Sequence, residues 1–165
     1  MANVGCAVNI VLVEPQIPQN AGNVARTCAV TGAALHLVRP MGFEVDDRKL
    51  KRAGLDYWHE LDLTYYQSTD DFLERTSGPY VFFTSRCGVL YTQHEYPHGV
   101  FLVFGSEVDG LHESLLRKFP QSLAQLPMLG GARCLNLSST VAAAAYEALR
   151  TQGFSQLQIK CEINI

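Results

Sequence analysis

The sequence lacks an excess of positive charge and lacks any long apolar segment. Its 165 residues include 13 Lys and Arg and 16 Asp and Glu, which gives a formal net charge of −3. Proteins that coat nucleic acid without sequence preference make many phosphate contacts, so this charge balance argues against that class. No apolar run reaches the roughly 18 residues of a membrane helix, and the first residues lack the basic region of a signal peptide. We expect a soluble, cytoplasmic protein that does not bind membranes, with one compact domain over residues 1–165.

The cysteines match no disulfide or metal pattern. They number five and are widely spaced, which fits neither a disulfide framework nor paired C-x-x-C zinc ligands. Residues 94–98 spell HEYPH, which matches the zinc pattern H-E-x-x-H. That pattern works only on a helix, and Pro97 disfavours a helix there. We therefore expect reduced thiols and no metal ion.

Several motifs of nucleotide-binding and hydrolytic enzymes are also missing. The glycines do not form G-x-G-x-x-G, since Gly105 and Gly110 are five positions apart and Gly130 and Gly131 are adjacent. This excludes the usual dinucleotide fingerprint, and no Walker lysine is present. No serine lies within G-x-S-x-G, which weakens a hydrolase interpretation.

Short apolar segments alternate with segments of helical periodicity. We expect strands at residues 7–13, 35–38, 61–65, 80–84, 100–104 and 123–126, and helices at 20–32, 46–53, 68–75 and 111–118 and after Asn136. This alternation predicts an α/β fold with a mostly parallel sheet and helices on both faces. Residues 85–99 are expected to form a loop, and the tail at 154–165 has no clear role.

Polar residues follow several of the predicted strands. Ligands of parallel sheets bind at the carboxyl ends of the strands. The Gly-rich loop at 126–136 leads into an Ala-rich helix and is a candidate pocket, although an ordinary β–loop–α connection explains it equally well. Asn20 is either part of this site or simply a helix cap. The polar residues at these strand ends are Asn20, Asn23, Arg26, Glu107, Arg133, Asn136 and Ser138.

A basic cluster lies between the second and third predicted strands. Arg48, Lys49, Lys51 and Arg52 place four of the 13 basic residues within five positions. Such a cluster is either a local nucleic-acid patch or a solvated helix face.

Three segments together resemble the signature motifs of the SPOUT class of RNA ribose methyltransferases. They are NAGNVAR (20–26), FGSEVDG (104–110) and LPMLGGARCLNLSSTVAAAAYE (126–147), in the order and at the spacing of that class. The chain is most similar to the branch that methylates the tRNA wobble nucleotide, through IVLVEPQIPQNAGNVART (10–27) and LHLVRPMGFEVDDRKLKRAGLDYW (35–58).

The resemblance implies a fold whose C-terminal part is threaded into a trefoil knot, an exception to the usual absence of knots. It implies that S-adenosylmethionine binds in the knot and leaves as S-adenosylhomocysteine, with no metal. Relatives often have Ser where this chain has Cys134; a main-chain contact would survive this change, whereas a hydroxyl contact would be lost. The pocket residues implied are Phe83, Thr84, Gly105, Glu107, Leu126, Cys134 and Leu135.

The resemblance also assigns the central catalytic role to Arg26. A guanidinium is a poor base because it stays protonated in proteins, so we expect Arg26 to orient the ribose 2′-OH or the adjacent phosphate and to stabilise the developing alkoxide. Asn20, Asn136 and Ser138 would hold Arg26 and the substrate in place, and Glu107 would brace the loop or a dimer.

The implied reaction is 2′-O-methylation of cytidine or modified uridine at the wobble position, with leucine tRNAs as substrates. The implied assembly is a homodimer with a shared active site. The anticodon stem-loop, rather than DNA, would contact Arg48, Lys49, Lys51, Arg52 and Arg133. The alternatives are a non-catalytic RNA-binding or assembly module with the same fold, and a methyltransferase acting on another RNA.

Overall fold

The computed structural model describes residues 7–44, 61–132, 134–155 and 157–159. The helix predicted at 46–53, the basic cluster at 48–52 and Arg133 lie outside these residues. Among the described helices, none is long and apolar enough to cross a membrane.

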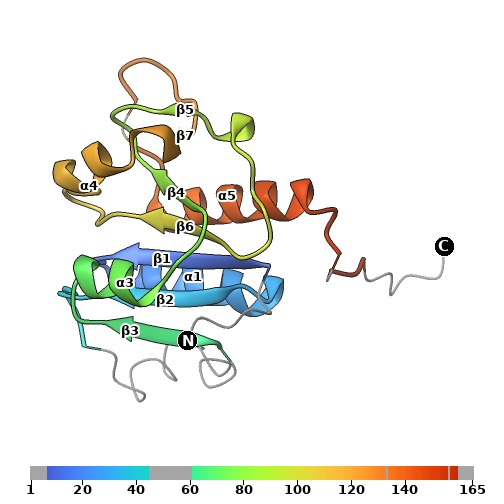
Figure 1. Cartoon of the computed structure of the whole chain (residues 1–165), viewed down its shortest axis with the longest axis horizontal. Coiled ribbons are helices and arrows are strands. Elements are labelled where there is room, and N and C mark those ends of the chain that lie inside the picture. Colours follow the sequence, from blue (N-terminus) through green and yellow to red (C-terminus); the bar gives the residue numbers. More distant parts are fainter. Residues whose placement is uncertain (1–6, 45–60, 133, 156, 160–165) are drawn as a thin grey trace.

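One sheet of seven parallel strands forms the middle of the protein (Figure 1). Its strands follow the order β3-β2-β1-β6-β4-β7-β5. The predicted α/β class with a parallel sheet is confirmed. The strands are β1 (Val8–Val13), β2 (Ala34–Val38), β3 (Leu63–Tyr66), β4 (Tyr80–Phe83), β5 (Val89–Leu90), β6 (Val100–Phe104) and β7 (Leu123–Gln125).

Six of the seven strands lie where the apolar segments predict them, and their ends differ by no more than two residues from those expected. Strands β1, β2 and β6 are buried along their whole length, as short apolar runs in a covered parallel sheet should be. The prediction that residues 85–99 form only a loop is wrong. This segment contains β5, which pairs with β7, and the short 3₁₀ helix η2 (Tyr91–Gln93). Both side chains of β5 are exposed, so no apolar periodicity marks this strand.

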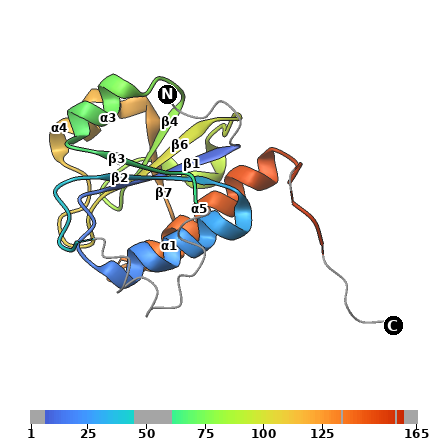
Figure 2. The ribbon, with the colours of Figure 1, turned by 90° about the horizontal axis from the view of Figure 1, so that it is seen from below.

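Helices cover both faces of the sheet, as predicted (Figure 2). Helices α1 (Pro18–Thr31) and α5 (Leu137–Thr151) lie together on one face, and α3 (Thr69–Arg75) and α4 (Glu113–Lys118) lie on the other. A 3₁₀ turn, η3 (Pro120–Ser122), leads into β7. Each face of the sheet has its own cluster of buried apolar side chains, so the sheet separates the core into two parts.

The helix ends agree only partly with the predicted caps. Helix α1 begins after Ile17, with Pro18 in its first turn, and Asn20 lies inside the helix. The interpretation of Asn20 as a helix cap is therefore wrong. Gly32 ends α1 in a left-handed conformation, as expected. Asn136 caps α5 by accepting a hydrogen bond from the backbone N–H of Ser138.

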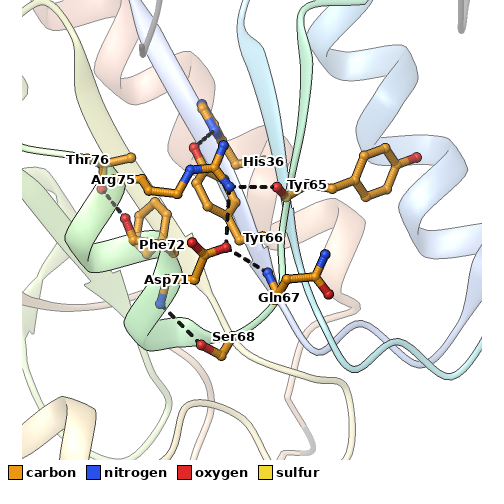
Figure 3. A network of polar contacts seen from close by, with 9 residues as sticks. All are labelled: His36, Tyr65, Tyr66, Gln67, Ser68, Asp71, Phe72, Arg75 and Thr76. Atoms are coloured by element: carbon orange, nitrogen blue, oxygen red, sulfur yellow. Dashed lines mark hydrogen bonds and ion pairs between the residues drawn. The ribbon is translucent and has the colours of Figure 1, made fainter.

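A buried histidine lies in the sheet between two polar partners. The Asn9 side-chain amide donates to the Gly99 carbonyl at 3.0 Å, which leaves its oxygen facing His36 Nε2 at 3.2 Å. On the other side, His36 Nδ1 lies 3.0 Å from the Tyr66 hydroxyl (Figure 3). Nε2 therefore carries the proton and donates to Asn9, and Nδ1 accepts from Tyr66.

Helix α3 is held against β3 by a second group of polar contacts (Figure 3). The Arg75 guanidinium lies 4.6 Å from the centroid of the Tyr66 ring and donates to the Tyr65 carbonyl at 3.2 Å. Asp71 accepts from Arg75 at 3.3 Å and from the backbone N–H of Gln67 at 2.8 Å. These contacts fix α3 on the sheet face opposite α1 and α5.

The end of α5 is tied to two segments that lie far from it in the sequence. The Gln152 side-chain amide is within hydrogen-bond distance of the carbonyls of Ala7, Tyr96 and Pro97, at 3.2, 2.9 and 3.2 Å. It thereby joins α5 to the residue before β1 and to the segment before β6. Among the described residues after Gly153, Leu157 is partly buried and packs against the apolar cluster that includes residues of α1 and α5.

Candidate active site

A pocket of about 360 Å³ opens at the carboxyl ends of β4, β6 and β7. This is the edge at which parallel sheets bind their ligands. The sequence predicted nine residues that line it: Asn20, Phe83, Thr84, Gly105, Glu107, Leu126, Cys134, Leu135 and Asn136. The structure therefore brings together residues from all three motif segments and from the end of β4.

Gly105 allows the loop after β6 to fold tightly against the pocket. A Cβ atom at this position would overlap the backbone of Gly110 and Leu111. The loop is closed by backbone hydrogen bonding between Gly110 N–H and the Ser106 carbonyl at 3.0 Å. The Ser106 hydroxyl also accepts from Asp109 N–H at 3.1 Å. Only glycine fits this close approach, which explains its place in the motif.

A chain of hydrogen bonds joins the three motif segments at the pocket. The Asn20 amide donates to Glu107 Oε1 at 2.9 Å. The Asn136 amide donates to the Asn20 oxygen at 2.9 Å. The Asn136 oxygen in turn accepts from the backbone N–H and the hydroxyl of Ser138, at 2.9 and 2.7 Å. Glu107, Asn20, Asn136 and Ser138 therefore form one polar chain, which fixes the start of α5 relative to α1.

Glu107 also holds the backbone that leads into α1. Its carboxylate accepts from the backbone N–H groups of Gln16 and Ile17, at 2.8 and 3.2 Å. Partial burial raises the pKa of Glu107, but the hydrogen bonds from Gln16, Asn20 and Ile17 outweigh it and hold the pKa below its ordinary value. The carboxylate is therefore ionised at neutral pH, and it interacts favourably with the N-terminal end of the helix.

The floor of the pocket is apolar. The rings of Phe83 and Phe104 stack with centroids 4.7 Å apart and an interplanar angle of 16°. Leu126 and Leu135 add apolar side chains from the two ends of the loop that follows β7. A small ligand with one flat apolar part and several polar groups suits such a site. Within the described part of the chain, no group of His, Cys, Asp and Glu could hold a metal ion.

Two of the predicted catalytic residues, both within the described part of the chain, are not in the pocket lining. Arg26 lies on the exposed side of α1, beyond Asn20. Ser138 reaches the site only through its hydrogen bonds with Asn136. Arg133 lies outside the described residues.

One pocket residue with clear chemistry was not predicted. Arg86 follows β4, lines the pocket and donates from Nη2 to the Asp109 carbonyl at 2.9 Å. Its position just after a strand is the same signal that identified the other polar residues. It was overlooked because residues 85–99 were expected to be an ordinary loop.

Comparison with known proteins identifies the class to which this sheet, pocket and polar chain belong. The sequence model of the SpoU rRNA Methylase family matches residues 7–146, and the chain belongs to this family. A Burkholderia ambifaria relative named tRNA (cytidine(34)-2′-O)-methyltransferase is 45% identical over 150 residues, which cover 88% of this chain and 96% of the relative. The resemblance to methyltransferases of the tRNA wobble nucleotide is therefore confirmed.

Solved structures agree with this assignment. A protein studied for 2-OH methylation of C/U34 on tRNA is 43% identical, has a TM-score of 0.83 and aligns over 90% of this chain and 92% of its own. An AdoMet-bound rRNA methyltransferase from Sinorhizobium meliloti is 27% identical, with a TM-score of 0.77 over 87% of this chain and 56% of its own.

Proposed function

We propose that this protein methylates the ribose 2′-OH of the wobble nucleotide of tRNA, cytidine or modified uridine at position 34. The polar chain from Glu107 through Asn20 and Asn136 to Ser138 carries this proposal, because it joins all three motif segments at one pocket. The relatives named for this reaction match nearly the whole chain, which supports the choice of substrate.

The pocket fits S-adenosylmethionine. Its volume is within the range of small-ligand sites, and its walls combine apolar side chains with the ends of three strands. The cofactor, when bound, supplies a methyl group already activated by a sulfonium, so the site needs no metal. The residues that would hold it are Phe83, Thr84, Gly105, Leu126, Cys134 and Leu135.

The catalytic groups act by placing the 2′-OH. Asn136 is held from both sides, by Asn20 and by Ser138, so its amide group has a fixed orientation. Fixed donors and acceptors of this kind lower the barrier by orienting the reacting hydroxyl. Arg26 would stabilise the developing alkoxide rather than take the proton, because a guanidinium stays protonated and is a poor base.

The position of Arg26 supports a homodimer. It is exposed on α1 and does not line the pocket of its own chain, so a second copy would bring an Arg26 to each pocket. Helices α1 and α5 pack together, and they expose the apolar side chains of Val30 and Tyr146, at 62% and 47%. These side chains suit an interface between copies.

The strand order supports the trefoil knot. Helices α4 and α5 come before and after β7 and lie on opposite faces of the sheet. Strand β7 itself lies between β4 and β5. Segment 84–99 leaves β4, pairs with the far side of β7 and returns to β6 along α5, where Gln152 binds it. The chain from β7 to α5 would therefore pass through the loop formed by segment 84–99.

The tRNA would lie over the carboxyl edge of the sheet. The basic cluster at 48–52 and Arg133 are the proposed contacts for the anticodon stem-loop, on the strength of their sequence. We place the protein in the cytoplasm, where tRNA is the substrate, and expect leucine tRNAs to be used.

The test is to incubate the protein with S-adenosylmethionine and unmodified tRNA and to map 2′-O-methylated nucleosides by mass spectrometry. The wild type should methylate position 34. Arg26→Ala should lose at least about a hundredfold in rate while still binding tRNA and cofactor, and Gln158→Ala, at an exposed tail position, should match the wild type. Methylation only of another RNA, or cofactor binding without transfer to any RNA, would contradict the proposal.

A further inference from the structure

The described arginines differ in how their charge is balanced. Arg75, Arg117 and Arg150 each pair with a carboxylate of their own helix. Arg86 has no such pair among the residues that the structure describes, and it lies at the pocket mouth. The loop after β4 therefore carries a positive charge that no described side chain neutralises.

Arg86 is held between two loops of the site. Its backbone N–H donates to the Thr84 hydroxyl at 3.2 Å, which fixes the turn after β4. Its Nη2 donates to the main-chain carbonyl of Asp109 at 2.9 Å, across the pocket mouth. The neutral carbonyl of Asp109 thus orients the guanidinium without neutralising its positive charge.

The nearest pocket carboxylate does not compete for Arg86. Glu107 already accepts hydrogen bonds from Gln16, Ile17 and Asn20. A guanidinium has five N–H donors in a planar fork, and the contact with Asp109 uses one of them. The rest of the fork suits a phosphate, which binds arginine with two parallel hydrogen bonds.

We propose that Arg86 binds a backbone phosphate of the substrate RNA beside the methylated nucleotide and so positions that nucleotide over the pocket. The proposal rests on the RNA-methylating function above. An RNA phosphate is favoured over an anionic group of the cofactor because Ser85, Arg86 and Cys87 are all exposed, whereas Phe83 and Gly105 at the pocket floor are buried. The site therefore faces solvent, from which RNA approaches.

The test compares Arg86→Ala and Arg86→Lys with Arg117→Ala, which removes the same charge from an exposed position on α4. Binding of tRNA is measured across a salt series and binding of S-adenosylmethionine by calorimetry. Arg86→Ala should weaken tRNA binding about tenfold and reduce the slope of log K against log salt by about one. Arg86→Lys should restore the slope but not the full affinity, because lysine lacks the fork. Cofactor affinity and thermal midpoint should match those of Arg117→Ala.

Three results would overturn the proposal. If Arg86→Ala loses cofactor affinity but binds tRNA normally, the anionic group that Arg86 binds belongs to the cofactor and not to the RNA. If Arg86→Ala binds tRNA and cofactor as the wild type does, Arg86 only connects the loops after β4 and β6. This conclusion would hold even if the wild type methylates position 34. A wild type that binds no tRNA would overturn both proposals. A wild type that binds tRNA with the expected Arg86 effect but does not methylate it would contradict only the proposed function.

Discussion

Acid should destabilise the protein through His36, because the folded state keeps this buried imidazole neutral. Burial lowers the pKa of His36 from 6.5 to about 4, and the charge of Asp62 opposes this only partly. Between these values the unfolded chain binds more protons than the folded protein, so stability is complete above pH 6.5 and is lost as the pH falls towards 4. The whole difference is worth about 3 kcal/mol, and about 2 kcal/mol of it is lost by pH 5.

The measurement is urea unfolding at several pH values from 8 to 5. Wild type is compared with His36→Gln and with His98→Gln, which changes an exposed histidine. At pH 8 the His36→Gln protein should be about 1 to 2 kcal/mol less stable than wild type, because it loses the bond with Tyr66. Its unfolding free energy should then fall less steeply with acid, while His98→Gln should follow the wild type.

The carboxylates titrate in all three proteins, so their contribution cancels in the comparison. If the unfolding free energies of His36→Gln and the wild type fall by the same amount between pH 8 and pH 5, His36 is not the group that makes the fold sensitive to acid. If the unfolding free energy of the wild type falls by much less than about 1 kcal/mol between pH 8 and pH 5, His36 does not make the protein sensitive to acid.

Three other substitutions test the site and the closure of the fold. Gly105→Ala should weaken binding of S-adenosylmethionine at least about tenfold in calorimetry, because its Cβ overlaps the Gly110 backbone; wild-type binding would contradict this close approach. Gln152→Leu should cost about 1 to 2 kcal/mol in urea unfolding, since it leaves the carbonyl of the buried Tyr96 without the Gln152 donor, and Gln158→Leu is the exposed control. Glu107→Gln should lower stability by about 1 kcal/mol, because it removes the negative charge beside the N-terminal end of α1. An unchanged unfolding curve would show that this charge does not stabilise the fold.

The fold was largely predictable because most strands are covered on both faces. Burial of β1, β2 and β6 makes their sequences continuous apolar runs, which are easy to recognise. Strand β5 escaped prediction because it is two residues long and its pairing uses only the backbone.

The site was predictable as a set of residues but not as a network. Polar residues at strand ends indicated Asn20, Glu107 and Asn136, and the family resemblance supplied the roles. That Asn20 bonds to both other residues rather than capping α1 depends on contacts between positions far apart in the chain. Such contacts leave no local pattern, whereas Arg86 has one, its position just after β4, and was missed because residues 85–99 were expected to be an ordinary loop.

The strand order sets a sequence of events during synthesis. Val8 of β1 pairs with Val100 of β6, so one edge of the first strand remains unpaired until well over half of the chain has been made. Strand β7 then enters between β4 and β5, which are already complete by that stage. Pairings between such distant segments form slowly. A growing chain therefore exposes unpaired strands with apolar side chains for a long period. Chaperones that shield such strands should raise the yield of folded protein.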